Sequence, residues 1–160
     1  MLQPLPPGTT APDFELLNQA DQPLRLSSLR GRLVVLAFYP LDWSPTCTDQ
    51  LSVYQQALPR FEELGAQLIG ISVDSRYSHT AFAEARDLTF PLLADFHPKA
   101  AVAQLYGTYR EDKGYAGRTV YVIDADGVIT FSNVAAAGTF QPADLVLAEV
   151  EKARGQAVTA

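Results

Sequence analysis

Residues 32–47 read RLVVLAFYPLDWSPTC, and this stretch decides the fold. All but the first of residues 32–39 are apolar, which predicts a strand buried on both faces in the middle of a sheet. Pro40 ends this strand because proline has no N–H to donate to the ladder. Ser44 followed by Pro45 then predicts a helix, with serine as the N-cap and proline in the first turn. A buried strand that leads into a helix in this way is typical of an α/β fold.

Downstream of the N-cap, strands and helices alternate. The first helix has an apolar stripe at a spacing of three and four residues, and Pro59 lies inside it. This proline should kink or end the helix. Residues 67–73 predict a second buried strand. Two short helices are expected over residues 79–86 and 99–106, separated by the segment 90–94.

The C-terminal third predicts a hairpin and a last helix. Residues 119–123 and 128–131 form the hairpin, with Asp126-Gly127 in its turn. Residues 142–154 form the helix, which we expect to end at Gly155. This order of elements matches a thioredoxin-like fold, an α/β architecture with a central mixed sheet flanked by helices.

The N-terminal segment should be an extension of this fold. Residues 5–14 are rich in proline and glycine and should be extended, and residues 14–17 and 24–26 could pair as a short hairpin. The chain contains neither an internal repeat nor a linker. We therefore expect residues 1–160 to form a single domain.

Composition narrows the functional classes. The 160 residues are 48% hydrophobic and 19% charged, and 12 basic against 18 acidic residues give a net charge of −6. An acidic chain without a basic run is a poor candidate for binding nucleic acid or an anionic membrane. The longest apolar run, 33–39, is far shorter than the ~20 residues needed to cross a bilayer. The first residues do not resemble a secretory signal, so we expect a cytoplasmic protein.

Cofactor and metal sites are not expected. Cys47 is the single cysteine, which excludes an internal disulfide and a cysteine-based zinc site. The two histidines, His79 and His97, are far apart in the sequence, and neither is expected to be catalytic. No lysine follows a glycine, so the chain lacks a phosphate-binding P-loop.

Cys47 is the most informative residue. With Ser44 as N-cap, Cys47 lies in the first helical turn, where free N–H groups and the positive end of the helix dipole favour a thiolate. Such positions are typical of nucleophilic cysteines. Position alone leaves the alternative of a buried structural thiol open, since free cysteine is among the most buried residue types.

The sequence around Cys47 resembles the peroxiredoxins of the AhpC/TSA superfamily. Pro40, Ser44 and Cys47 match the signature Pro-x-x-x-Thr/Ser-x-x-Cys directly after a buried strand. Further family segments occur in the same order: APDF (11–14), ISVDS (71–75), SHTAF (78–82), FPLLAD (90–95) and GRTVYVIDADG (117–127). The resemblance covers residues 5–152 and is strongest to the bacterioferritin-comigratory-protein and AhpE-like branches. It implies a thiol-dependent peroxidase with a thioredoxin-like fold.

The resemblance also implies roles for individual residues. Cys47 would be the peroxidatic cysteine, whose thiolate attacks hydrogen peroxide or an organic hydroperoxide and becomes a sulfenic acid. Arg118 would hold the thiolate and the negative oxygen that develops, and Pro40 would shield the sulfur from water. The Ser44 hydroxyl would bond the sulfur or the peroxide. The alternative for Ser44 is an ordinary N-cap that bonds the Cys47 N–H.

Three further residues should surround the sulfur. Gln50 stands where relatives commonly have glutamate, and an amide should neutralise and orient Arg118 less than a carboxylate. Trp43 is expected either to wall the pocket or simply to pack. Tyr39, at the end of the buried strand, completes this set.

The sulfenic acid needs an outside reductant, because Ser52 occupies the position at which some relatives have a resolving cysteine. We expect an external thiol, either a thioredoxin-like or glutaredoxin-like protein or a low-molecular-weight thiol, with an intersubunit Cys47–Cys47 bridge as the alternative. A homodimer is expected. Two other functions remain as alternatives: a thiol–disulfide oxidoreductase, although residues 44–47 supply only one sulfur, and a non-catalytic thioredoxin-like binding module or holdase chaperone.

Overall fold

Strand β3 (Leu33–Phe38) lies at the centre of a five-stranded mixed sheet, and all six of its residues are buried. The computed structural model describes residues 2–159. The other strands are β4 (Ala66–Ser72), β5 (Leu92–Ala94), β8 (Thr119–Ile123) and β9 (Ile129–Val134), in the order β5-β4-β3-β8-β9. Strand β3 is parallel to β4 and antiparallel to β8. The α/β class and the central mixed sheet are therefore confirmed.

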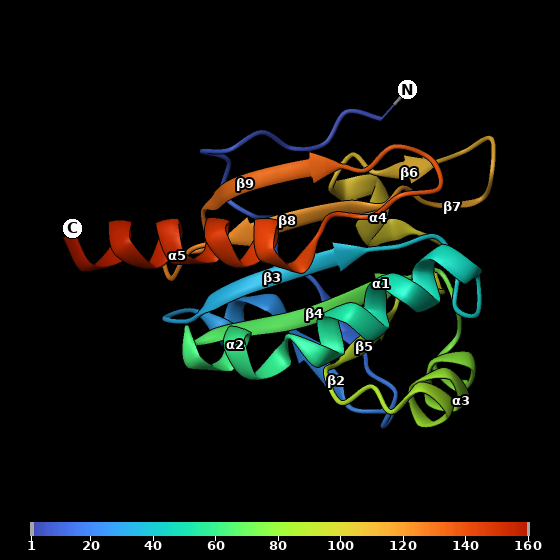
Figure 1. Cartoon of the computed structure of the whole chain (residues 1–160). Helices are drawn as coiled ribbons and strands as arrows, with labels where there is room; N and C mark the ends of the chain where they lie inside the picture. Colours follow the sequence, from blue (N-terminus) through green and yellow to red (C-terminus); the bar gives the residue numbers. More distant parts are fainter. Residues whose placement is uncertain (1, 160) are drawn as a thin grey trace.

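Helices cover both faces of the sheet (Figure 1). On one face lie α1 (Pro45–Gln56), α2 (Leu58–Glu63) and α5 (Ala143–Thr159), and α3 (Arg76–Arg86) packs beside β5. The other face is covered by α4 (Ala101–Leu105), the 3₁₀ helix η1 (Leu26–Leu29) and the hairpin of β1 (Glu15–Leu17) and β2 (Pro23–Arg25). A second small hairpin joins β6 (Tyr109–Arg110) to β7 (Tyr115–Ala116).

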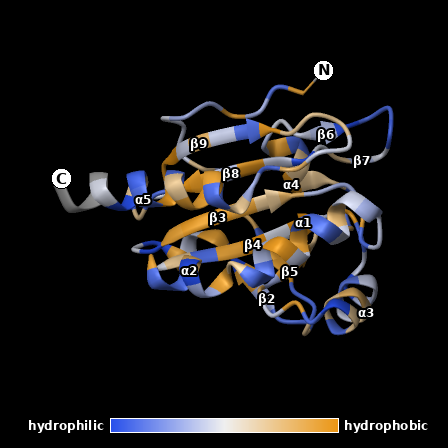
Figure 2. Cartoon of the chain, viewed as in Figure 1, coloured by the Kyte–Doolittle hydropathy of each residue, from blue (hydrophilic) through white to orange (hydrophobic). Residues whose placement is uncertain are grey.

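The sheet divides the core into two apolar layers, and the central strand β3 is accordingly hydrophobic throughout in Figure 2. Successive residues of a strand point to opposite faces, so Val35 and Ala37 face the layer that contains Cys47. Leu36 and Phe38 face the other layer, where Phe38 packs against Tyr106 with ring centroids 5.5 Å apart. A strand covered on both faces explains why its sequence shows no polar alternation.

Several sequence predictions are confirmed. The N-terminal hairpin forms, with Leu16 opposite Leu24, and β8 pairs with β9. The first helix breaks at Ala57, and α2 then begins with Pro59 in its first turn. The extended N-terminal segment lies along the main sheet, where the Gly8 N–H donates to the carbonyl oxygen of Ile129 at 2.7 Å.

Other predictions were wrong or incomplete. Gly155 does not end the last helix, because α5 runs through it to Thr159. A helix-ending glycine needs a positive φ, which Gly155 does not have, and a glycine inside a helix costs only about 1 kcal/mol. Helix α3 begins before His79, because Ser75 is its N-cap and accepts a hydrogen bond from the Ser78 N–H at 3.2 Å. Strands β5, β6 and β7 were not predicted as strands.

The sheet brings together two segments that are distant in sequence. Strand β3 leads through residues 39–44 into α1, and Arg118 directly precedes β8. In the β3–β8 ladder, Phe38 lies opposite Thr119, so both segments leave the same end of the sheet (Figure 1). Among residues 2–159, no helix is both long enough and apolar enough to cross a bilayer.

Candidate active site at Cys47

Cys47 and Arg118 meet at the end of the sheet where β3 leads into α1. Nη1 of Arg118 donates a hydrogen bond to Sγ of Cys47 over 3.0 Å. Cys47 lies in the first turn of α1, so its sulfur is also near the positive end of the helix dipole. A fixed cation and a helix N-terminus both stabilise negative charge on the sulfur or on an oxygen bound to it.

The sulfur is buried. Cys47 has no exposed surface and belongs to the apolar layer on the α1 side of the sheet. Burial alone fits the structural-thiol alternative, but a structural thiol needs no guanidinium donor, and taking the charge of Arg118 even partly out of water has a cost. The contact with Arg118 therefore favours a reactive thiol.

Gln50 is the second partner of the Arg118 guanidinium. Its Oε1 accepts from Nη1 of Arg118 at 2.9 Å, and its side chain is fully buried. None of the ion pairs found among residues 2–159 includes Arg118. The amide thus orients the guanidinium and leaves its charge without a carboxylate partner among the described residues.

Ser44 occupies the N-cap position, but its hydroxyl bonds neither the Cys47 N–H nor the Cys47 sulfur. Its backbone is extended, with φ −65° and ψ 144°, as an N-cap requires. The hydroxyl donates to the carbonyl oxygen of Leu41 at 3.1 Å and makes no capping bond to α1. The turn over residues 41–44 brings the Leu41 carbonyl within reach of the Ser44 hydroxyl.

The remaining predicted residues lie in and beside the loop that connects β3 to α1. Pro40 is half-buried directly beyond β3. Trp43 has a φ of +72°, is 49% exposed and packs edge-on against Phe82 at a centroid distance of 5.1 Å, which matches the packing alternative. Tyr39 is fully buried, and its hydroxyl donates to Oδ1 of Asp42 at 2.6 Å.

A buried polar network that the sequence reasoning missed holds this loop in place. Oδ2 of Asp42 lies 2.8 Å from Nδ1 of His79, and both side chains are completely buried. The Ser78 hydroxyl also donates to Oδ2 of Asp42 at 2.8 Å. The Asp42 N–H donates to Oδ2 of Asp74, whose pKa is raised by burial. Asp42 thereby fastens the segment between Pro40 and α1 to α3 and β4.

The proton positions in this network follow from its acceptors. Nε2 of His79 lies 3.0 Å from the carbonyl oxygen of Leu93, which can only accept, so Nε2 carries a proton. One further proton lies between Nδ1 and Asp42. Burial and the neighbouring Asp42 raise the pKa of Tyr39 well above its usual range, so its hydroxyl remains a donor. The Asp42 carboxylate is therefore contacted by Tyr39, Ser78 and His79. Both ring nitrogens of His79 are used in this network, so His79 holds the loop and makes no hydrogen bond to the sulfur.

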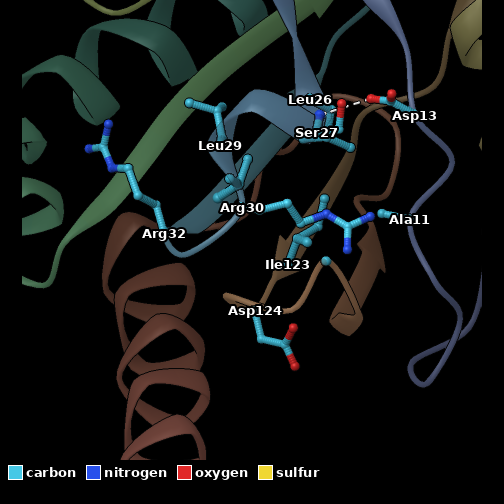
Figure 3. A pocket seen from close by; sticks show the side chains of 11 residues that line it. Ala11, Asp13, Leu26, Ser27, Leu29, Arg30, Arg32, Ile123 and Asp124 are labelled. Carbon is cyan, nitrogen blue, oxygen red and sulfur yellow. Dashed lines mark hydrogen bonds between the residues drawn. The ribbon is translucent and has the colours of Figure 1, made fainter.

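A small pocket at the other end of the sheet does not belong to this site (Figure 3). It lies near the start of β3 and is lined by Ala11, Asp13, Leu26, Arg30, Asp124 and neighbouring residues. Its volume of about 10 Å³ holds roughly one water molecule. The Asp13 carboxylate there accepts the Ser27 N–H at 2.8 Å, which fixes the start of η1.

The sequence and the fold are similar to those of known proteins. The sequence profile of the AhpC/TSA family matches residues 7–132. Alkyl hydroperoxide reductase E of Mycobacterium tuberculosis is 39% identical over 128 residues, covering 79% of this chain and 84% of that protein. Chloroplastic peroxiredoxin Q of Sedum lineare is 39% identical over 127 residues, covering 76% of this chain and 65% of that protein. The crystal structure of peroxidoxin BcpB from M. tuberculosis superposes with a TM-score of 0.83 at 34% identity, covering 91% of this chain and 96% of that one.

Proposed function

The chain belongs to the AhpC/TSA family and is a thiol-dependent peroxidase, and from this premise we propose that Cys47 is its peroxidatic residue. The observation that supports this assignment is the 3.0 Å hydrogen bond from Nη1 of Arg118 to Sγ of the chain's single cysteine. Arg118 is the electrostatic partner of the reaction. Gln50 orients Arg118, and Pro40, Trp43, Ser44 and Tyr39 shape the loop before α1.

In the proposed reaction the Cys47 thiolate attacks one oxygen of the hydroperoxide. An S–O bond forms as the O–O bond breaks, so that sulfur loses two electrons and the peroxide gains them. The departing oxygen leaves as hydroxide or alkoxide and takes a proton to become water or an alcohol. The Arg118 guanidinium stabilises negative charge first on the sulfur and then on the oxygens of the transition state.

Ionisation of the thiol alone cannot supply the rate. An unperturbed cysteine is about 3% thiolate at pH 7, so complete ionisation gains at most roughly 30-fold, or about 2 kcal/mol. Enzymes typically accelerate reactions by at least about a million-fold. The larger part of the catalysis must therefore come from donors directed at the breaking O–O bond, of which Arg118 is the one charged example at this site.

An external thiol completes the proposed cycle. The sulfenic acid condenses with this thiol to a mixed disulfide and water, and a second thiol releases Cys47. The chain has one cysteine, so no internal disulfide can compete. We propose that a thioredoxin-like or glutaredoxin-like protein, or a low-molecular-weight thiol, acts here on a cytoplasmic homodimer.

Trapping of the sulfenic acid tests the proposal. One equivalent of hydrogen peroxide followed by dimedone should give one adduct by intact-mass analysis, located on Cys47 by peptide mapping. Added dithiothreitol should sustain peroxide consumption. Protein alkylated with iodoacetamide beforehand is the control and should do neither. If neither the adduct nor turnover appears with unmodified protein, Cys47 is not peroxidatic, and a binding module or holdase becomes the better interpretation.

Overoxidation should follow when the reductant is scarce. Without a resolving cysteine the sulfenic acid persists, so excess peroxide should convert it to sulfinic and then sulfonic acid. Intact mass should therefore show two and then three added oxygen atoms, with activity lost in parallel and not restored by dithiothreitol. Equal peroxide given together with a large excess of dithiothreitol is the control. Full recovery of activity after peroxide treatment alone would contradict this prediction.

A further inference from the structure

Gln141 lies outside the signature around Cys47 but is linked to it by hydrogen bonds. It is 2% exposed and directly precedes Pro142 and α5. Resting on the proposed peroxidatic role of Cys47, we propose that Gln141 is a positioning residue for the reaction. It fixes the orientation of the Gln50 amide, and Gln50 in turn holds the Arg118 guanidinium at the sulfur.

The first step is the orientation of the Gln141 amide. Its Nε2 donates to the carbonyl oxygens of Arg118 and Asn133 at 3.1 and 2.9 Å. Both partners can only accept, so both protons of Nε2 are used. The amide cannot flip without placing its own oxygen against two carbonyl oxygens. Oε1 of Gln141 is therefore committed to the opposite direction, toward Gln50.

The second step is the orientation of the Gln50 amide. Its Nε2 donates to Oε1 of Gln141 at 3.4 Å and to the Tyr54 hydroxyl at 3.3 Å. That hydroxyl donates its own proton to the backbone carbonyl oxygen of Gln141 at 2.8 Å, so it can only accept from Gln50. Burial raises the pKa of Tyr54 to about 12, which keeps this donor protonated at neutral pH. Two fixed acceptors thus direct Nε2 of Gln50 away from Arg118.

The third step is the consequence for Arg118. With its nitrogen committed, Gln50 can present only its oxygen to Nη1 of Arg118, 2.9 Å away. One proton of Nη1 goes to this oxygen and the other to Sγ of Cys47. Gln141 therefore acts on Arg118 in two ways. It donates directly to the Arg118 backbone carbonyl, and it orients Gln50, which accepts a hydrogen bond from the Arg118 guanidinium. Because every member except Arg118 is neutral, this network orients the guanidinium without offsetting its charge.

Kinetics of the Gln141→Met variant test the proposal. Methionine is of similar size but cannot make the hydrogen bonds, so the guanidinium loses its fixed position. A misplacement of about 1 Å in a catalytic group can cost up to ~100-fold, and a displacement through one intermediate residue should cost about ten-fold. The measurement is the second-order rate constant of sulfenate formation by stopped flow, on the pH plateau where the thiol is ionised. Circular dichroism and thermal unfolding confirm that the variant is folded.

A double-mutant cycle separates positioning from a general loss of stability. In an Arg118→Ala background, Gln141→Met should cause no further loss of rate, because the group that it positions is absent. Val150→Ala is the control: it truncates a fully buried residue of α5 outside the network and should lower the melting temperature while the plateau rate stays at the wild-type value.

A second pair of variants keeps the test decisive if Gln141→Met folds poorly. Gln50→Met should also slow sulfenate formation about ten-fold, and the Gln50→Met/Gln141→Met double variant should be no slower than either single variant. Wild-type rates for both single variants, or losses that multiply in the double variant or in the Arg118→Ala background, would overturn the positioning role. If the wild type forms no sulfenate, or Arg118→Ala matches the wild type, it is the proposed function that fails.

Discussion

Replacing Arg118 with alanine is expected to slow the attack of Cys47 on peroxide by about 100- to 1000-fold, the usual loss when one donor to a transition-state anion is removed. The loss should persist at a pH at which Cys47 is fully ionised. The reason is that Nη1 of Arg118 lies 3.0 Å from the sulfur, where it can follow the negative charge from sulfur to the peroxide oxygens. Stopped-flow fluorescence of the single tryptophan, four residues before Cys47, offers a suitable signal.

Two further variants define the result for Arg118. Lysine keeps the charge but not the rigid, planar guanidinium whose Nη1 directs one proton to Sγ and the other to Oε1 of Gln50, so the rate of Arg118→Lys should fall between those of the wild type and Arg118→Ala. Arg60→Ala is the matched control, because Arg60 is an exposed arginine whose ion pair with Asp144 lies on the surface, and it should react like the wild type. Equal plateau rates for Arg118→Ala and the wild type would refute a role of Arg118 in the transition state.

Replacing His79 with alanine is expected to lower the free energy of unfolding by about 3–5 kcal/mol, the typical cost of removing one partner from a buried pair. His79 and Asp42 are both completely buried, 2.8 Å apart, and the lost imidazole also leaves the Leu93 carbonyl without its donor. The Asp42 carboxylate would then accept hydrogen bonds from the hydroxyls of Tyr39 and Ser78 alone. Urea unfolding followed by circular dichroism measures the change.

The chain provides a matched control for this prediction. His97 is its other histidine and is exposed, so His97→Ala should change the free energy of unfolding by less than about 0.5 kcal/mol. Asp42→Asn should cost only about 1 kcal/mol, because the amide can donate to Nδ1 of a neutral His79 and still accept from Tyr39. A loss below 1 kcal/mol for His79→Ala would show that the buried pair does not hold the loop.

Most of the fold could be predicted because its main elements have local signals. The apolar run at residues 33–39, Pro59 inside a helical stripe and the Asp-Gly turn each specify backbone geometry within a few residues. Strand β5 was missed because its three residues show no periodicity, and its place in the sheet depends on pairing with β4. The expectation that Gly155 ends the last helix was wrong, because the structural context of a helix can override the preference of one residue.

The residues of the candidate site also differ in whether a local sequence signal predicts them. Cys47 and Arg118 could be predicted from the motif that surrounds each of them. His79 lies in a segment that was recognised, yet its partner Asp42 is 37 residues away, and no spacing rule connects them. Gln141 has no local signal at all, because a single glutamine before a proline is ordinary in a loop. For Ser44, the sequence did not reveal that the hydroxyl donates to a backbone carbonyl three residues earlier, because this contact depends on the local turn.

The pairing of Phe38 in β3 with Thr119 in β8 also determines when the site forms during folding. Cys47 is synthesised 71 residues before Arg118, so the two side chains can meet only after the chain has been made through Arg118. A nascent or partly unfolded molecule therefore exposes an ordinary thiol, without the neighbours that speed its oxidation. With the proposed role of Cys47, full reactivity requires β3 to pair with β8, so the recovery of peroxidase activity on refolding should report the formation of this long-range pairing.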